Sequence, residues 1–205
     1  EAVMKLDRKF YSRDTLILAK DLLGKIIVHN TGSTILKGKI VETEAYLGVI
    51  DKAAHAYGGK KTKRVMPMYG MPGTAYVYLI YGMYYCFNIV AKEEGVPEAV
   101  LIRGIEPIEG IDEMAINRFK KPYAELSNYQ KKNLSNGPGK LCIALNIDKS
   151  HNEEDLCGDR LYLESGKGKD FETVETTRIG IDYAEESKDW PCRFYIKGNS
   201  YVSKL

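Results

Sequence analysis

The segment at residues 74–91 constrains the fold more than any other part of the chain. It contains two runs, 74–80 and 84–91, that are rich in tyrosine and aliphatic residues, a composition typical of β-strands. Only Tyr81-Gly82-Met83 separates the two runs. We therefore predict a β-hairpin with Tyr81 at its tip, where its own hairpin can bury little of the ring.

Further strand-like runs lie before and after this hairpin, with helical patterns between them. The expected strands are 25–29, 34–45, 98–105, 160–164, 173–179 and 192–196. The expected helices are one capped by Ser12 or Asp14 with Leu16, Ala19, Leu22 and Leu23 on its apolar face, one with Pro107 in its first turn that ends near Phe119, and one over 140–146. This order favours an α+β fold with a mainly antiparallel sheet.

The length of the chain, 205 residues, is enough for one well-buried domain and marginal for two. No repeat, low-complexity tract or long linker divides the sequence, so we expect a single domain over 1–205. No apolar stretch is long enough to span a bilayer, and the N-terminus lacks the pattern of a signal peptide. We therefore expect a protein of the cytoplasm or nucleoid.

The four cysteines form no CxxC pair and, with the three histidines, show no metal-ligand spacing. We accordingly expect no metal and no cofactor. The net charge is only +2, but basic residues gather in the segments 52–64 and 118–140. Such clusters can neutralise phosphates, or they can form a solvated surface, and the sequence favours neither interpretation.

Two carboxylates share one face of the strand expected at 34–45. Because side chains alternate along a strand, Glu42, Glu44 and Tyr46 lie on the same face. The strand ends at Leu47-Gly48, and the ends of strands are where binding and catalytic residues are usually placed. The alternative interpretation is an ordinary solvent-exposed face.

Other polar and aromatic side chains interrupt apolar strands. Tyr76 and Tyr78 share one face of the hairpin, while Asn88 and Arg103 occur within or at the end of apolar runs. A buried amide or guanidinium group must find hydrogen-bond partners. Each of these residues alone is more often structural than functional.

Taken together, these segments resemble the alkyladenine (3-methyladenine) DNA glycosylase family, in its bacterial form. The matching segments are VETEAYLG (41–48), AAH (53–55), PGTAYVYLIYGMYYCFNI (72–89), LIRGIEP (101–107), NGPGKLC (136–142) and RFYIKG (193–198). The resemblance implies a monofunctional enzyme that flips alkylated or deaminated purines out of duplex DNA and hydrolyses the glycosidic bond, which leaves an abasic site. It also implies a compact domain around a curved antiparallel sheet with a hairpin that enters the DNA, and a monomer that needs no obligate protein partner. We expect no membrane partner, because no apolar stretch could span a bilayer.

The resemblance further implies roles for residues at matching positions. Glu44 corresponds to the base that activates the attacking water. Arg103 helps to hold that water and the phosphate of the flipped nucleotide, and the backbone carbonyl of Ile179 completes the water site. No lysine or cysteine nucleophile is needed, so we expect no strand cleavage.

Recognition of the base and of the duplex is implied in the same way. Tyr46, His55 and Tyr78 enclose the extruded base, and the backbone N–H of His55 contacts the edge of the base. Asn88 obstructs the amino group of normal guanine, and Tyr81 fills the gap left in the duplex. The remaining implied DNA contacts are Met83, Tyr84, Thr62, Lys63 and Arg64.

Two other functions fit parts of the sequence. A carbohydrate-active hydrolase could use Glu42 and Glu44 as a pair, since same-face strand positions lie about 6–7 Å apart, between the two glycosidase geometries. The single tryptophan and the basic clusters weigh against it. A non-catalytic nucleic-acid binding module could use the tyrosines for stacking, but Glu44 would repel phosphate.

Overall fold

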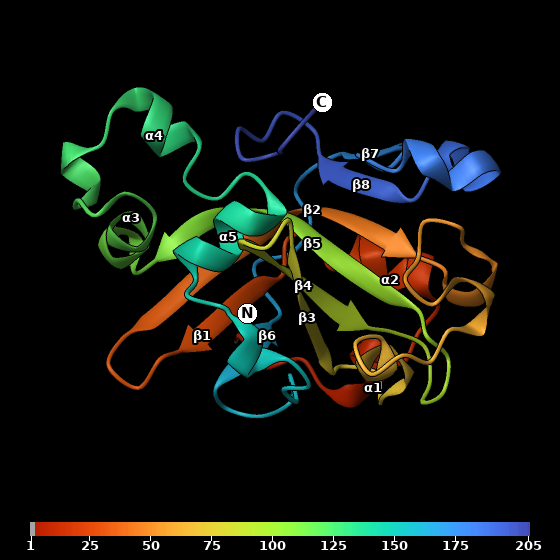
Figure 1. The fold of residues 1–205 in the computed structure, drawn as a ribbon. Helices are drawn as coiled ribbons and strands as arrows, with labels where there is room; N and C mark the ends of the chain where they lie inside the picture. The colour runs from red at the N-terminus through yellow and green to blue at the C-terminus, as the bar shows by residue number, and fades with distance from the viewer. Residues whose placement is uncertain (1–2) are drawn as a thin grey trace.

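An antiparallel sheet of eight strands forms the framework of the computed structural model, which describes residues 3–205 (Figure 1). The strands are β1 (Ile26–Asn30), β2 (Ile35–Tyr46), β3 (Ala75–Ile80), β4 (Tyr84–Val90), β5 (Ala99–Glu109), β6 (Leu161–Glu164), β7 (Thr173–Thr176) and β8 (Arg193–Ile196). The α-helices are α1 (Arg8–Tyr11), α2 (Thr15–Asp21), α3 (Ile111–Phe119), α4 (Asn128–Lys132) and α5 (Pro138–Ala144). Short 3-10 helices are η1 (Gly48–Ile50), η2 (Tyr57–Gly59), η3 (Met66–Tyr69), η4 (Tyr123–Glu125), η5 (Lys149–His151) and η6 (Asp182–Asp189). The expected α+β class with an antiparallel sheet and a hairpin is confirmed.

The long strand β2 lies at the centre of the sheet. The strand order is β3-β4-β5-β2-β1-β6, and β8 pairs with both β2 and β7. On one edge β2 pairs with β5, and on the other it pairs first with β1 and then, at Glu42 to Glu44, with β8. Both edges of β2 are therefore covered where its two glutamates lie.

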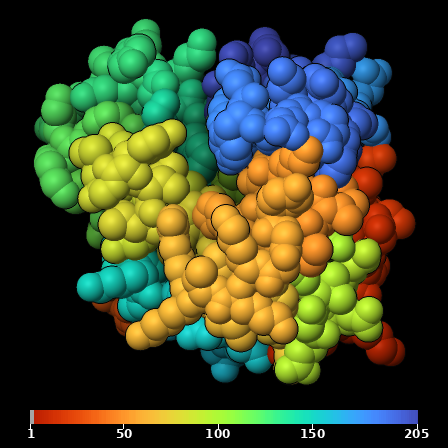
Figure 2. Space-filling view, turned by 45° about the vertical axis from the view of Figure 1, so that its right-hand side comes forward, coloured from red at the N-terminus to blue at the C-terminus, as the bar shows by residue number. Residues whose placement is uncertain are grey.

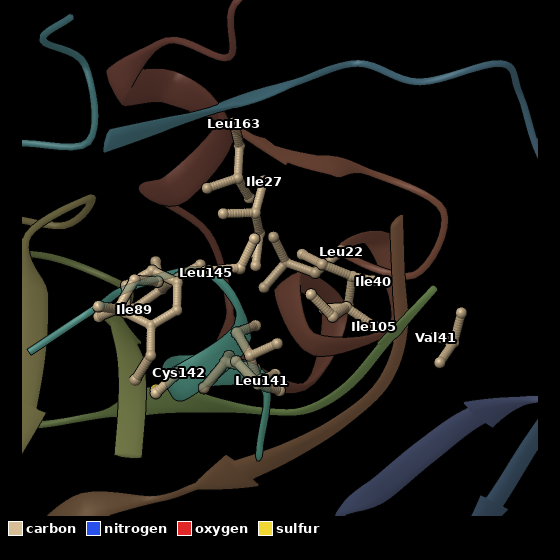
Figure 3. Close-up of a cluster of buried hydrophobic side chains, with 14 of the residues drawn as sticks. Leu22, Ile27, Ile40, Val41, Ile89, Ile105, Leu141, Cys142, Leu145 and Leu163 are labelled. Atoms are coloured by element: carbon tan, nitrogen blue, oxygen red, sulfur yellow. The ribbon is translucent and has the colours of Figure 1, made fainter. Parts of the chain in front are cut away.

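The core joins the sheet to α2 and α5. Figure 3 shows side chains from the end of α2, from β1 and β2, from α5 and from β6 in one cluster, and Leu22, Ile27, Ile40, Leu141 and Leu163 are all fully buried in it. Burying an aliphatic side chain of this size contributes about 1.5–3 kcal/mol. This packing holds α5 against β4 and β5. The loop that precedes α5 lies beside the hairpin.

The helix near residue 14 forms as expected, with one difference on its apolar face. Asp14 caps α2, because its carboxylate accepts a hydrogen bond from the Ile17 N–H at 3.2 Å. Ala19 and the following leucines, Leu22 and Leu23, are buried, whereas Leu16 is only partly buried. Deciding between Ser12 and Asp14 thus required the structure.

The helix predicted to begin near Pro107 is wrong at its start. β5 continues through Pro107 to Glu109, and α3 begins only at Ile111. Pro107 lies opposite Gly38, next to a register shift in the pairing of β2 and β5. At such an irregularity a residue without an N–H group is tolerated in a strand.

The strand predicted over 173–179 is also shorter than expected. β7 pairs with β8 only from Thr173 to Thr176. The next carbonyl, that of Thr177, accepts a hydrogen bond at 2.8 Å from the side chain of Arg193. The ladder therefore ends there, and the chain turns away toward the end of β2.

A buried histidine pair joins β1 to η5. The His29 Nδ1–H donates to the Leu145 carbonyl at 2.6 Å, and the Asp148 N–H donates to His151 Nδ1 at 3.1 Å. The two Nε2 atoms lie 3.0 Å apart, so His151 must donate to His29 in this contact. The chain of bonds is complete only when both rings are neutral. Burial lowers the pKa of both rings, that of His151 to about 4, and the nearby charge of Arg160 acts in the same direction.

We expect this pair to make stability depend on pH between about 6.5 and 4. The unfolded histidines bind protons in this window while the folded pair does not, so the free energy of unfolding falls by about 1–3 kcal/mol as the pH decreases. Urea denaturation at a series of pH values measures the slope. His151→Gln should make it shallower, and equal slopes for both proteins would contradict the assignment.

Candidate active site

A cavity of about 410 Å³, here called the central pocket, opens where β2 ends beside the β3–β4 hairpin. Figure 2 shows the face on which the loop after β2, the hairpin and the segment around η6 surround a hollow. The predicted site residues that line the pocket are Tyr46, His55, Tyr78, Tyr81, Asn88, Arg103 and Ile179. The structure thus brings together residues separated by more than a hundred positions in the sequence.

Glu44 lies directly behind the wall of this pocket and has no exposed surface. Its Oε1 accepts a hydrogen bond from the Tyr46 hydroxyl at 2.9 Å, as the shared strand face predicts. Its Oε2 accepts a hydrogen bond from the Ile179 N–H at 2.8 Å. Both donors line the pocket. The exposed-face alternative for Glu42 and Glu44 is wrong, because both side chains are fully buried.

A β-bulge places the arginine that accompanies these glutamates. Glu42 pairs with Gly104 and Thr43 with Ile102, so Arg103 is an extra residue without a partner on β2. A bulge of this kind redirects a side chain. The guanidinium of Arg103 lies 3.6 Å from Glu44 Oε1 and 3.7 Å from Glu42 Oε2, while the side chain also reaches the pocket.

Opposing influences act on the pKa of the Glu44 carboxyl. Burial raises the pKa of its carboxyl, while the charge of Arg103 and the hydrogen bonds from Ile179 and Tyr46 oppose this shift. Each carboxylate oxygen can accept two hydrogen bonds. The carboxylate therefore retains the capacity to accept a bond from a water molecule.

Aromatic rings form a further part of the pocket wall. The His55 ring lies 4.5 Å from the ring of Tyr78, and its Nδ1 lies 2.9 Å from the Tyr76 hydroxyl. Burial lowers the pKa of His55 to about 4 and raises that of Tyr76 to about 12. The pocket therefore presents neutral aromatic groups at neutral pH. Asn88 is buried beside them, and its amide donates to the Tyr76 carbonyl at 3.1 Å.

The tip of the hairpin holds Tyr81 in an unusual backbone conformation. Tyr81 and Gly82 have φ angles of 52° and 67°, and the Met83 N–H donates to the Ile80 carbonyl at 3.1 Å. Positive φ at both central residues belongs to a type I′ turn, which normally selects asparagine followed by glycine. Tyrosine in the left-handed region costs about 1–2 kcal/mol. The turn nevertheless projects this ring outward with 88% of its surface exposed.

The hairpin is supported from the side by α5. A side chain at Gly139 would meet the ring of Tyr84 at 2.9 Å, so only glycine permits this packing. Met83 beside it is exposed. The predicted contact residues Met83 and Tyr84 therefore follow Tyr81 on the same hairpin. The ring of Tyr84 packs against α5, whereas the side chain of Met83 is exposed.

The basic loop 60–64 lies beside the same opening. Its predicted contact residues Thr62, Lys63 and Arg64 are all exposed. Arg64 donates to the Leu79 carbonyl at 3.0 Å, which ties the loop to the hairpin. Lys52, at the start of this basic segment, is instead held by the carboxylates of Glu185 and Glu186.

Several residues of the pocket were not predicted. Tyr76 shares a strand face with Tyr78, a signal that was present in the sequence, but Tyr183 carries no comparable signal. Others in this group are Ala53, Met68, Ile80, Cys86, Leu101, Pro138, Gly180 and Ile181. Within residues 3–205 no cluster of three or more metal-ligating side chains occurs, and no helix there is long and apolar enough to cross a bilayer.

The fold and the pocket combine an antiparallel sheet with a cavity that is lined by aromatic side chains and lies next to a buried carboxylate. The family model of methylpurine-DNA glycosylases matches residues 9–200. The chain belongs to this family. It is 63% identical to a protein of Clostridium tetani over 98% of its own length and 100% of the relative. The corresponding values for a Clostridium acetobutylicum protein are 60%, 98% and 98%, and both relatives bear the name "Putative 3-methyladenine DNA glycosylase".

We expect His55 to titrate near pH 4, far below a free histidine, because its ring is largely removed from solvent and lies near the positive charges of Arg64 and Lys60. Replacing Arg64 by glutamine should raise this pKa by removing one of those charges. Heteronuclear NMR titration of the imidazole measures both values. Lys63→Gln is the matched control from the same loop and should shift the pKa less. A value near 6.5 in the unmodified protein would contradict the burial of this ring.

Proposed function

We propose that this protein excises damaged purines of the 3-methyladenine type from double-stranded DNA by hydrolysing the N-glycosidic bond, with Glu44 activating the water. The observation that carries the proposal is the set of partners of Glu44. Tyr46, Arg103 and Ile179 all contact its carboxylate and all line the central pocket. A nucleobase in this pocket would therefore lie next to the group that performs the chemistry.

Entry of the base requires flipping, since the glycosidic bond is inaccessible inside a duplex. Extrusion costs a few kcal/mol, and stacking on aromatic side chains returns about 1–3 kcal/mol per base. Tyr46, His55 and Tyr78 supply the faces and edges of such a pocket. A positively charged alkylated purine gains a further 0.5–2 kcal/mol or so from electron-rich rings.

The bond-breaking step uses Glu44 and Arg103. As the bond between C1′ and the base nitrogen breaks, its electron pair leaves with the base and positive charge develops on the sugar. The water attacks C1′ and gives its proton to Glu44. The product is DNA with an abasic site and the free base. The carboxylate stabilises the developing charge as well as accepting the proton. Arg103 and the carbonyl of Ile179 hold the water in this proposal.

The duplex is held open by Tyr81. The exposed ring at the hairpin tip would occupy the place of the flipped base, with Met83 and Tyr84 in the groove beside it. The exposed residues Lys63 and Arg64 would neutralise phosphates near the opening. In this proposal one molecule binds one lesion, so a monomer suffices.

The geometry disfavours the two other functions. Glu42 accepts hydrogen bonds from Arg193 at 2.8 Å and from the Ser203 N–H at 2.7 Å, and neither residue lines the pocket. A glycosidase pair would need both carboxylates at the substrate. A module that only bound nucleic acid would gain nothing from an acid buried behind its pocket.

Glu44→Gln should slow the release of the free base by about 10²–10⁴-fold, because the amide cannot accept the proton of the water. Binding to the damaged duplex should persist. Single-turnover release from duplexes that carry 3-methyladenine, 7-methylguanine, hypoxanthine or ethenoadenine measures the first effect, and fluorescence anisotropy measures the second.

Glu98→Gln provides the matched control for this variant. Glu98 is a partly buried glutamate that pairs with Thr15 and Lys92, away from the pocket. It should release base at the unmodified rate. Retention of full activity by Glu44→Gln would refute the assigned chemistry.

Tyr81→Asn should weaken binding to a damaged duplex by roughly 5- to 150-fold, which corresponds to the loss of about 1–3 kcal/mol of stacking. The same change should leave the melting temperature of the protein equal or raise it, because asparagine favours the positive φ of this type I′ turn. Tyr129→Asn is the control, since Tyr129 is exposed but lies outside the pocket. Unchanged binding by Tyr81→Asn would refute the proposal that Tyr81 occupies the place of the flipped base.

A further inference from the structure

Another buried ion pair, between Arg178 and Asp51, lies behind the wall of the central pocket, next to Tyr46. The guanidinium of Arg178 binds the carboxylate of Asp51 through two contacts, at 2.5 and 2.9 Å. Both side chains are completely inaccessible to solvent. The carbon of the guanidinium lies 5.0 Å from the centre of the Tyr46 ring. This pair touches the pocket wall without lining the pocket.

The hydrogen bonds of the pair join three separate parts of that wall. Arg178 also donates to the carbonyl of Ala45, at the end of β2, at 3.1 Å, and to that of Ser187, in η6, at 3.0 Å. Asp51 accepts from the backbone N–H groups of Leu47 and Ala53, at 2.8 and 3.0 Å, in the loop that leads to His55. The residue after Arg178 is Ile179, whose N–H binds Glu44.

Stability alone gives a weak reason for this arrangement. The Nε–H of Arg178 is buried without any hydrogen-bond partner within the described residues 3–205. Replacing a buried ion pair by apolar groups is often neutral or stabilising, and an unpaired buried donor adds a further cost. The planar guanidinium instead contributes to positioning, because its N–H groups hold several acceptors close to one plane.

We propose that Arg178 and Asp51 are positioning residues that hold Tyr46, the 47–55 loop and the Ile179 N–H in register around Glu44. The inference rests on the proposed function of Glu44 but concerns different residues. Without the pair, the Ile179 N–H would no longer be aimed at the carboxylate. Because that bond favours the ionised form of Glu44, its loss would leave the glutamate harder to deprotonate.

The test compares Arg178→Lys and Asp51→Asn with a matched control, Arg13→Lys. Arg13 also pairs with a carboxylate, that of Asp21 at 2.6 Å, donates to a carbonyl, and has one buried NH2 group without a partner among residues 3–205. Neither Arg13 nor Asp21 lines the pocket. Amide exchange at Ile179 is followed by NMR, and single-turnover base release is measured from pH 5 to 8.

In both test variants the hydrogen-exchange rate of the Ile179 amide should rise about tenfold or more. In Arg13→Lys this rate should stay unchanged. Base release should slow by about ten- to a hundredfold, and the acid limb of its pH profile should move to higher pH. A protected Ile179 amide, or an acid limb that stays in place, would overturn the proposal. If the unmodified protein releases no base, the proposed function fails, and the exchange result still decides whether the pair positions Ile179.

Discussion

The complete burial of the Glu44 carboxylate is the constraint on which the rest of the site depends. A charged group without solvent must be surrounded by donors or lose its charge. The protein takes these donors from three places: Tyr46 on the same strand, Arg103 on the neighbouring strand, and Ile179 from a segment 135 residues further along the chain. Each of the three also forms part of the pocket wall, so satisfying the carboxylate and shaping the cavity are the same structural task.

At the tip of the hairpin, in contrast, the protein keeps a side chain exposed to solvent at a cost in stability. Its turn places a tyrosine where asparagine would be less strained, and leaves the ring in solvent. The fold compensates nearby, since Gly139 allows the ring of Tyr84 to pack closely against α5. A strained, exposed aromatic residue on a supported scaffold is typical of a position kept for contact with a partner. The architecture of the hairpin therefore supports the role assigned to Tyr81 independently of the family.

Local patterns in the sequence predicted the parts of the fold that depend on neighbouring residues. Alternation along β2 placed Glu44 and Tyr46 on one face, and the apolar runs placed the hairpin within a residue of its observed ends. Pro107 was misread as a helix start, because the register shift that accommodates it depends on Gly38 of another strand. Likewise, no local signal connects Arg178 to Asp51 or the Ile179 N–H to Glu44, since these contacts exist only after the sheet has closed. The resemblance named residues that the structure brings to one pocket, but it did not give their geometry.

The distribution of charge separates the two tasks of the proposed enzyme. Positive side chains that could meet phosphates lie outside, in the exposed loop 60–64. Inside, burial keeps His55 neutral, with a pKa of about 4, and raises the pKa values of the tyrosines, so the rings carry no charge. Arg103, the one lysine or arginine among residues 3–205 that lines the pocket, is compensated by the glutamates behind it. A protonated histidine in this wall would repel a cationic purine, whereas a neutral wall accepts charged and uncharged bases alike. The low pKa of His55 therefore suits the proposed binding of cationic alkylated purines.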